Sequence, residues 1–195
     1  MTLKKCLILL SVLVLAACGR SKAVQFYILN PLPLPAHSSG KYQHLQIGID
    51  SIETPAYVEK PQIMLYLGRQ QVSMEEYHQW AESLDKTIKR VVATNLSTLL
   101  PGSVVQNSPW DIQFKPAWHL QITISQFKID ALGNSDLRAS YLIYEQERLV
   151  VKKERFYHIK TSDLSMDALV SSMNDNLNRL TRDIAHTFAM LRFRS

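Results

Sequence analysis

The sequence predicts a single α+β domain in which a mainly antiparallel sheet packs against two main helices as one compact sandwich. Most of the chain consists of segments whose apolar residues alternate with polar ones, the pattern of half-buried strands. Two other segments repeat apolar residues at spacings of three and four, the pattern of amphipathic helices. The order strands, helix, strands, helix, with hairpin-like links between strands, is typical of an α+β fold.

Three strands are predicted before the first helix. They are short apolar or alternating segments bounded by prolines and polar residues, and they cover residues 24–29, 44–52 and 62–67. Pro55 and Pro61 bound a turn between the last two strands, because proline withholds a backbone donor. Residues 75–80 are interpreted as a polar approach to the helix that ends in a core residue, Trp80.

The first helix is predicted over residues 84–99. Ser83 is the predicted N-cap, Asp85 in the first turn complements the helix dipole, and Pro101-Gly102 ends the helix. One face collects the apolar residues Leu84, Ile88, Val91, Val92, Leu96 and Leu99.

Further strands and a long helix are predicted in the second half. The strands cover residues 103–106, 118–129, 137–143 and 148–159. The alternation in the second of these slips after Ile124, which predicts a β-bulge near Ser125-Gln126. Gly133-Asn134 marks a turn. An apolar stripe over residues 166–191 then predicts a helix about 40 Å long at 1.5 Å per residue.

The N-terminus has the composition of a bacterial export signal. Lys4 and Lys5 precede a ten-residue run with one hydroxyl and no charge, and small residues follow. This run is too short to cross a bilayer as a helix, which takes about 20 residues.

The end of this signal resembles a lipobox, Leu15-Ala16-Ala17-Cys18-Gly19. In lipoproteins with such a signal the cysteine thiol is diacylated, the chain is cut just before it, and the freed amine takes a further acyl chain. The prediction is a signal peptide over 1–17, lipid attachment at Cys18, a lipidated tether over 18–23 and a domain over 24–195. An ordinary secretory signal with an incidental cysteine is the alternative.

Lipid attachment at Cys18 predicts a domain held close to a membrane. Two or three acyl chains, palmitate among them, bind durably where one chain binds only marginally. The tether reaches at most about 20 Å. Cys6 leaves with the signal peptide, so we expect no disulfide. In Gram-negative lipoproteins that resemble this chain, Asp after the cysteine favours the inner membrane, so Gly19 predicts the periplasmic face of the outer membrane.

The exported chain is mildly basic. Residues 1–17 hold two of the 22 basic residues and none of the 17 acidic ones, which leaves 20 against 17 and a net charge of +3. An exported lipoprotein does not meet nucleic acid, so this excess fits an anionic membrane surface instead. About 178 residues remain, which suits one domain.

The sequence contains no recognisable catalytic or metal-binding motif. Its six histidines are scattered without H-E-x-x-H or Cys-His pairing, and no P-loop, G-x-G-x-x-G or G-x-S-x-G occurs. His78 follows Glu75 and Glu76, where an acid–base pair is the alternative to a polar approach to the helix. We therefore expect no enzyme, no catalytic residue, no metal and no cofactor.

Four motifs in register resemble the PqiC family, also called ABC-type transport auxiliary lipoproteins. From residue 118 onward only the order of strands and helix continues the resemblance. The motifs are Phe26-Tyr27-Ile28-Leu29; Pro55-Ala56-Tyr57-Val58 with Lys60-Pro61-Gln62-Ile63; Trp80-Ala81-Glu82-Ser83-Leu84-Asp85; and Val92-Ala93-Thr94-Asn95-Leu96 before Leu100-Pro101-Gly102.

The resemblance implies an α/β sandwich similar to the N-terminal domain of TolB and an outer-membrane partner of a Pqi-type transport system. In such systems a PqiB-like, MCE-domain protein forms a tunnel across the periplasm and works with an inner-membrane permease, and some relatives accompany ABC-type lipid importers. Cys18 carries over as the lipid-attachment site. Tyr57, Pro61 and Trp80 match family positions and are candidate partner-binding residues; the alternative is that they form a rigid turn and a core contact.

Two functions follow as hypotheses. The first is a lipoprotein that docks the MCE tunnel at the outer membrane and supports envelope integrity, for which a homo-oligomeric ring would match the axis of the tunnel. The second is a periplasmic phospholipid-binding carrier, which needs an apolar cavity of about several hundred Å³ between sheet and helix. An envelope hydrolase is a third class, without a catalytic constellation to support it.

Overall fold

The computed structural model describes residues 22–34 and 40–191. The predicted signal peptide, Cys18 and most of the tether lie outside these described residues. Within these described ranges, two α-helices, α2 (Leu84–Leu99) and α3 (Met166–Leu191), and a short 3₁₀ turn, η1 (Ala56–Glu59), accompany one sheet. The described residues form eight strands: β1 (Gln25–Tyr27), β2 (Gln46–Glu53), β3 (Gln62–Tyr66), β4 (Val72–Trp80), β5 (Val104–Asn107), β6 (Trp118–Asp130), β7 (Asn134–Glu145) and β8 (Arg148–Lys160).

The sheet is built around β6. On one side, β6, β7 and β8 form an antiparallel meander along their full length. On the other side, β2 pairs with the first half of β6 and β3 meets its end, so that two short branches, β2–β5 and β3–β4–β1, lie beside the same strand. This long strand therefore holds both halves of the domain together.

The α+β fold class is confirmed, with one correction to the sheet. The pairs β1–β4, β2–β5, β2–β6 and β3–β6 are parallel, so the sheet is mixed rather than mainly a series of antiparallel hairpins. Parallel neighbours need a crossover connection, and the chain from β2 to β5 supplies one that includes α2. Hairpin-like links between successive strands do not reveal such crossovers.

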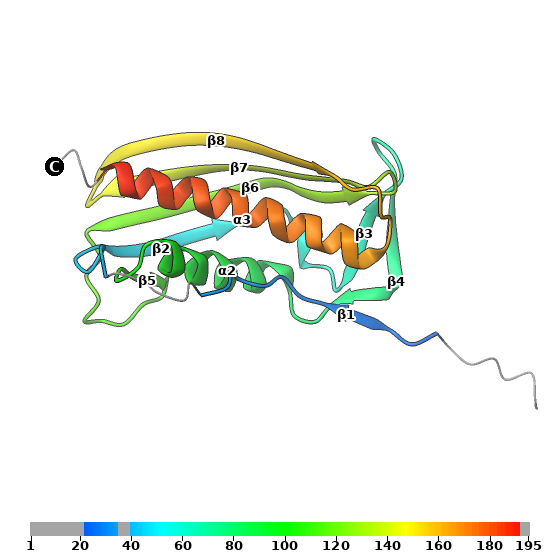
Figure 1. Ribbon diagram of the computed structural model, residues 1–195, viewed down its shortest axis with the longest axis horizontal. Coiled ribbons are helices and arrows are strands. Elements are labelled where there is room, and N and C mark those ends of the chain that lie inside the picture. The colour runs from blue at the N-terminus through cyan, green and yellow to red at the C-terminus, as the bar shows by residue number, and fades with distance from the viewer. Residues whose placement is uncertain (1–21, 35–39, 192–195) are drawn as a thin grey trace, which may run out of the picture.

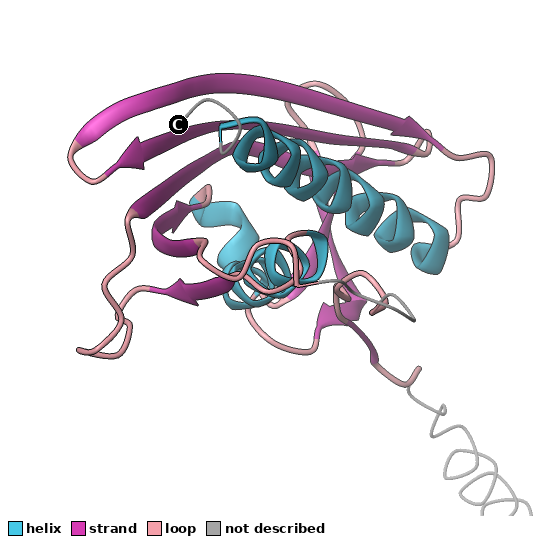
Figure 2. Cartoon of the chain, turned by 60° about the vertical axis from the view of Figure 1, so that its left-hand side comes forward, coloured by secondary structure: helices cyan, strands magenta, loops and turns pink. Residues whose placement is uncertain are grey.

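Among the described residues, both α-helices pack on one face of the sheet. Figure 1 shows α3 lying along β6, β7 and β8, with α2 beside it over the β2–β5 branch, and Figure 2 shows the same two layers from the side. Fully buried side chains from both layers fill the space between them, among them Leu120, Ile122, Ile143, Leu177 and Ile184. The apolar stripes of both helices therefore face the sheet, as their periodicity predicts.

Several local predictions are confirmed. The register of β6 against β7 shifts between Ile124 and Gln126, which is the predicted bulge. Gly133 has φ +85° in the turn that follows β6, a conformation that glycine adopts without strain. The first helix begins after Ser83 and ends at Leu99 as expected. The Ser83 hydroxyl, however, donates to the Asp85 carboxylate, where a capping serine would accept a bond from a backbone N–H.

The interpretation of residues 75–80 as a polar approach to the helix missed a strand, although Trp80 is a core residue as expected. These residues belong to β4, which lies between β1 and β3. The strand escapes detection because its register against β3 shifts near Gln62 and most of its residues are partly or fully exposed. Period-2 alternation is weak where neither face of a strand is uniformly buried.

No helix of residues 22–34 and 40–191 has the length and apolarity needed to cross a membrane.

Candidate functional site: the N-terminal arm and its contacts

The segment that begins with the last two residues of the tether is fixed to the domain by backbone and side-chain bonds. We define residues 22–34 as the N-terminal arm. Its strand β1 pairs with β4 in parallel, and the Ala81 N–H donates to the Tyr27 carbonyl at 2.8 Å. Leu29, just after β1, is fully buried in the core. The arm is therefore part of the folded domain from its first strand onward.

A buried asparagine joins the arm to both helices. The Leu32 N–H donates to Oδ1 of Asn95 on α2 at 2.7 Å. The Nδ2 of Asn95 donates to Asn178 Oδ1 at 2.8 Å and to Thr181 Oγ1 at 3.2 Å, both on α3. A second amide, Asn174 on α3, accepts a bond from the Asn30 N–H at 2.9 Å.

These bonds couple the orientation of the arm to that of the domain. Asn95 is fully buried, and a buried amide left without partners is costly. The arm, α2 and α3 must therefore keep this arrangement together. An anchor placed before the arm would act on a rigid body rather than on a flexible linker.

The structure brings Tyr57, Pro61 and Trp80 together in one region. The Tyr57 hydroxyl accepts the Phe127 N–H at 2.9 Å, directly after the β6 bulge. Burial raises the pKa of the Tyr57 hydroxyl above its ordinary value. The Trp80 N–H donates to the Pro61 carbonyl at 2.7 Å, and the Trp80 ring is buried in the core.

This arrangement gives each of the three residues a clear structural role. Tyr57 supplies an acceptor at a bulge, where a β-bulge disrupts the regular ladder. Trp80 offers little surface to a partner, so its burial favours the core role over direct contact. Tyr57 is partly buried, and Pro61 is exposed. Partner binding by these residues stays a prediction.

The pocket beside Tyr57 and Trp80 is small. It is also lined by Ile63, Phe127 and Met173, and its volume is about 20 Å³. That volume holds roughly one water molecule, whereas ligand sites usually measure at least about 300 Å³. This pocket does not supply the space that a phospholipid carrier needs between sheet and helix.

Three of the histidines each bond to a different partner. His78 Nδ1 lies 2.9 Å from the Tyr27 hydroxyl, so the His78 ring bonds to the arm. His119 lies 2.9 Å from Asp50, and His158 lies 2.8 Å from Asp136. Within the described residues, no group of three or more His, Cys, Asp or Glu side chains could hold a metal ion.

Sequence reasoning missed the asparagines that hold the arm. Asn95 carries a detectable signal, because it is a polar residue within the apolar stripe of a predicted amphipathic helix. Its partners carry none, since Leu32, Asn178 and Thr181 are 63, 83 and 86 residues away along the chain.

Comparisons with known proteins cover nearly the whole domain. The family described as the ABC-type transport auxiliary lipoprotein component matches residues 27–185. The chain is 22% identical over 162 residues to the intermembrane transport lipoprotein PqiC of Escherichia coli (strain K12), a match that covers 83% of this chain and 85% of that protein. The protein of the same name from Shigella flexneri gives the same values.

Solved structures share the fold. The crystal structure of an uncharacterized protein superposes with a TM-score of 0.71 at 20% identity, over 86% of this chain and 99% of that one. A protein from Xanthomonas campestris superposes with a TM-score of 0.68 at 12% identity, over 83% of this chain and 93% of that one.

Proposed function

The chain belongs to the ABC-type transport auxiliary lipoproteins, and we propose that it is the outer-membrane component of a Pqi- or MCE-type lipid transport system. In this role Cys18 carries the acyl chains, the domain lies at the periplasmic face, and its surface receives the tip of a PqiB-like tunnel protein. The inner-membrane permease of the system lies at the other end of that tunnel. The function is docking, which supports the integrity of the envelope.

The observation that carries this proposal is the short distance between the lipobox and a fixed arm. Cys18 precedes β1 by seven residues, a span of at most about 25 Å. Because the arm is bonded to α2 and α3, a lipid at Cys18 would limit the height of the whole domain above the membrane. Relatives named intermembrane transport lipoproteins support the same role.

Anchoring also makes a weak docking interface sufficient. A partner that searches along a membrane surface meets the domain at a high effective concentration, so modest affinity gives high occupancy. A homo-oligomeric ring of domains would present several copies of such an interface to a tunnel with a rotational axis.

Capture from the envelope tests the docking role. The lipidated protein, carrying a C-terminal affinity tag, is purified in a mild detergent from its native envelope, and the proteins that co-purify are identified. We expect an MCE-domain protein among them. Its consistent absence, with the tagged lipoprotein intact, would contradict docking.

The two cysteines allow a matched test of the anchor. We expect Cys18→Ala to abolish incorporation of radiolabelled palmitate and to leave an uncleaved precursor, because the lipobox then lacks its thiol. Cys6→Ala is the control, since Cys6 lies inside the predicted signal peptide and should leave labelling unchanged. Normal labelling of Cys18→Ala would refute the predicted attachment site.

A further inference from the structure

The arm carries three exposed apolar side chains, one within the edge strand β1 and one directly on either side of it in the sequence. Val24, Phe26 and Ile28 are 40%, 65% and 41% exposed, and the last two flank Tyr27, which is partly buried. The Tyr27 side chain bonds to His78 and to the exposed Gln25. The alternation along the arm therefore places an apolar row outward, where a soluble edge strand would normally carry polar residues.

The neighbouring strand extends this row. Phe26 pairs with Gln79, so Tyr77 lies two residues away on the same side of β4 and is 39% exposed. The Lys22 ammonium lies 5.3 Å from the centre of the Tyr77 ring. We define Val24, Phe26, Ile28 and Tyr77 as the arm patch.

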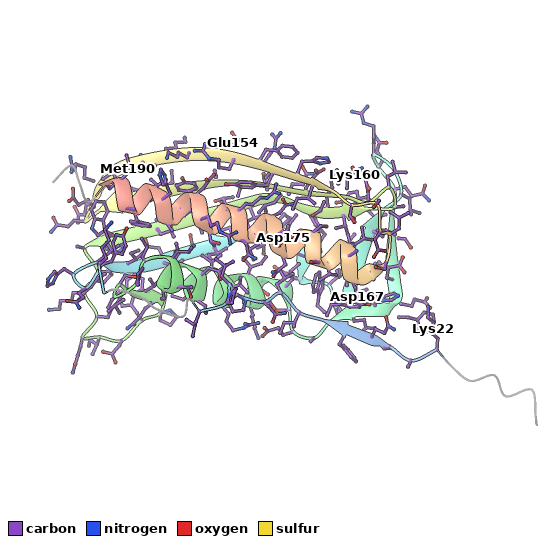
Figure 3. All side chains as sticks on the ribbon, in the orientation of Figure 1. Lys22, Glu154, Lys160, Asp167, Asp175 and Met190 are labelled. Atoms are coloured by element: carbon purple, nitrogen blue, oxygen red, sulfur yellow. The ribbon has the colours of Figure 1, made fainter. Side chains whose placement is uncertain are left out.

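The arm patch lies at the end of the molecule where the arm begins. Figure 3 labels Lys22 at this end, on the same side as Asp167 in the first turn of α3. The carboxylate-bearing Glu75 and Glu76 precede Tyr77 on β4 and limit the patch in that direction.

The position of the patch in the chain identifies its occupant. Val24 follows Cys18 by six residues, so an acyl anchor at Cys18 keeps the patch within about 20 Å of the lipid headgroups. Its chemistry fits the same surface: aliphatic and phenylalanine side chains enter the acyl boundary, while tyrosine and a flanking lysine favour the headgroup level.

We propose that the arm patch inserts into the interfacial layer of the phospholipid bilayer, so that protein side chains and acyl chains contact the membrane together. This inference rests on the proposed lipid anchor at Cys18. It gives the anchored domain a defined face toward the bilayer, because the patch belongs to the same arm that Asn95 and Asn174 hold. The acyl chains set the distance from the membrane, and the patch sets the orientation.

A single-cysteine label tests this contact in the lipidated protein. The exported chain retains only Cys18, whose thiol acylation consumes, so Phe26→Cys introduces one free thiol for an environment-sensitive nitrobenzoxadiazole dye. Phe26 is largely exposed, so the substitution leaves the core unchanged. The matched control is Ile112→Cys, which is 91% exposed in the loop between β5 and β6, at the opposite end of the molecule from β1 (Figure 1).

Both labelled proteins are reconstituted into vesicles of phosphatidylethanolamine and phosphatidylglycerol. We expect emission at position 26 to shift to shorter wavelength and to be lost when nitroxide-bearing lipids are added, with little quenching by aqueous iodide. The label at position 112 should keep its emission at longer wavelength, should not be quenched by the nitroxide-bearing lipids, and should be quenched by iodide. Accessibility of position 26 to iodide, equal to that of position 112, would overturn the inference.

Shielding of position 26 from both quenchers would also overturn it, because that result indicates a protein contact such as a second copy of the chain. The mass of the purified lipoprotein reports acylation separately, and capture of the MCE protein reports docking. If the protein is acylated and still captures its partner, but the label at position 26 is accessible to iodide, then membrane insertion of the arm patch is refuted while the proposed function is not.

Discussion

At the scale of single residues, the side chains with the largest consequences are those whose partners come from several elements. Asn95 is the clearest case, because its amide bonds to the arm and to two residues of α3 at once. A buried polar network stabilises a fold only when all its members are satisfied. Asn95 therefore fixes how the arm and the helices fit together.

We expect Asn95→Ala to lower the free energy of unfolding by about 1–3 kcal/mol, because buried polar groups on the arm and α3 lose their partner. Urea denaturation followed by circular dichroism measures this change. Thr94→Ala is the matched control, since the neighbouring side chain is exposed and should cost about 0.5 kcal/mol or less. Equal losses for the two variants would contradict the role given to the network.

Gly48 in β2 shows the same dependence on a distant segment. A Cβ at this position would lie 2.8 Å from Pro116 Cγ and 2.9 Å from the Trp110 ring. The loop between β5 and β6 therefore packs directly on the backbone of β2.

Gly48→Ala should lower stability by about 1–3 kcal/mol, the usual cost of overpacking. Gly68→Ala is the control, because no atom lies within 4 Å of its added Cβ, and we expect it to be close to neutral. Thermal unfolding of the two variants separates them. A Gly48→Ala protein as stable as Gly68→Ala would show that the loop moves away without cost.

At the scale of elements, α3 is bonded to the strands β7 and β8 of the meander by polar side chains along its C-terminal half. The Tyr157 hydroxyl and the Arg155 Nε donate to Asp183 at 2.5 and 3.1 Å. Thr187 bonds to the Tyr141 hydroxyl at 2.9 Å and accepts from Lys153 Nζ at 3.0 Å. These polar contacts hold β7 and β8 against α3, in addition to the apolar contacts of the core.

The partly buried bond between Tyr157 and Asp183 predicts that the protein loses stability at alkaline pH. Burial raises the pKa of Tyr157 above its ordinary 10.0, and the bond to Asp183 adds to the effect. The contribution of the Tyr157 hydroxyl to the free energy of unfolding is fully present below about pH 10. It falls above that pH, because the unfolded chain releases a proton that the folded chain retains. The free energy of unfolding should decrease by up to about 1.4 kcal/mol per pH unit from this residue.

Tyr157→Phe should make the decline above pH 10 shallower, since the variant has no proton to release at this position. Urea denaturation at several values between pH 9 and 11.5 gives the slope. An unchanged slope would mean that Tyr157 does not contribute to the alkaline transition.

At the scale of the whole molecule, one long strand and two helices hold a branched sheet together. The branch β3–β4–β1 carries the arm, while the meander and α3 form the larger part of the core. The network at Asn95 joins the arm to the layer of helices. A force or an orientation imposed at the start of the arm therefore reaches the body of the domain.

Local signals in the sequence determined much of this description. Some features depend only on neighbours within a few positions, so they can be predicted without knowledge of the tertiary structure. They are the helical periodicities of residues 84–99 and 166–191, the slip in alternation after Ile124 and the turn at Gly133. The lipobox is likewise a local pattern, and lipid attachment at Cys18 remains a prediction from it.

The tertiary structure alone decided which distant residues meet. It showed that β4 is a strand, that four pairs of strands run parallel, and that Asn95 bonds to the arm. It also showed that Val24, Phe26 and Ile28 of the arm are exposed. The reason is physical: strand pairing and burial depend on segments brought together across the chain, and their energies are not encoded in the spacing of any one segment.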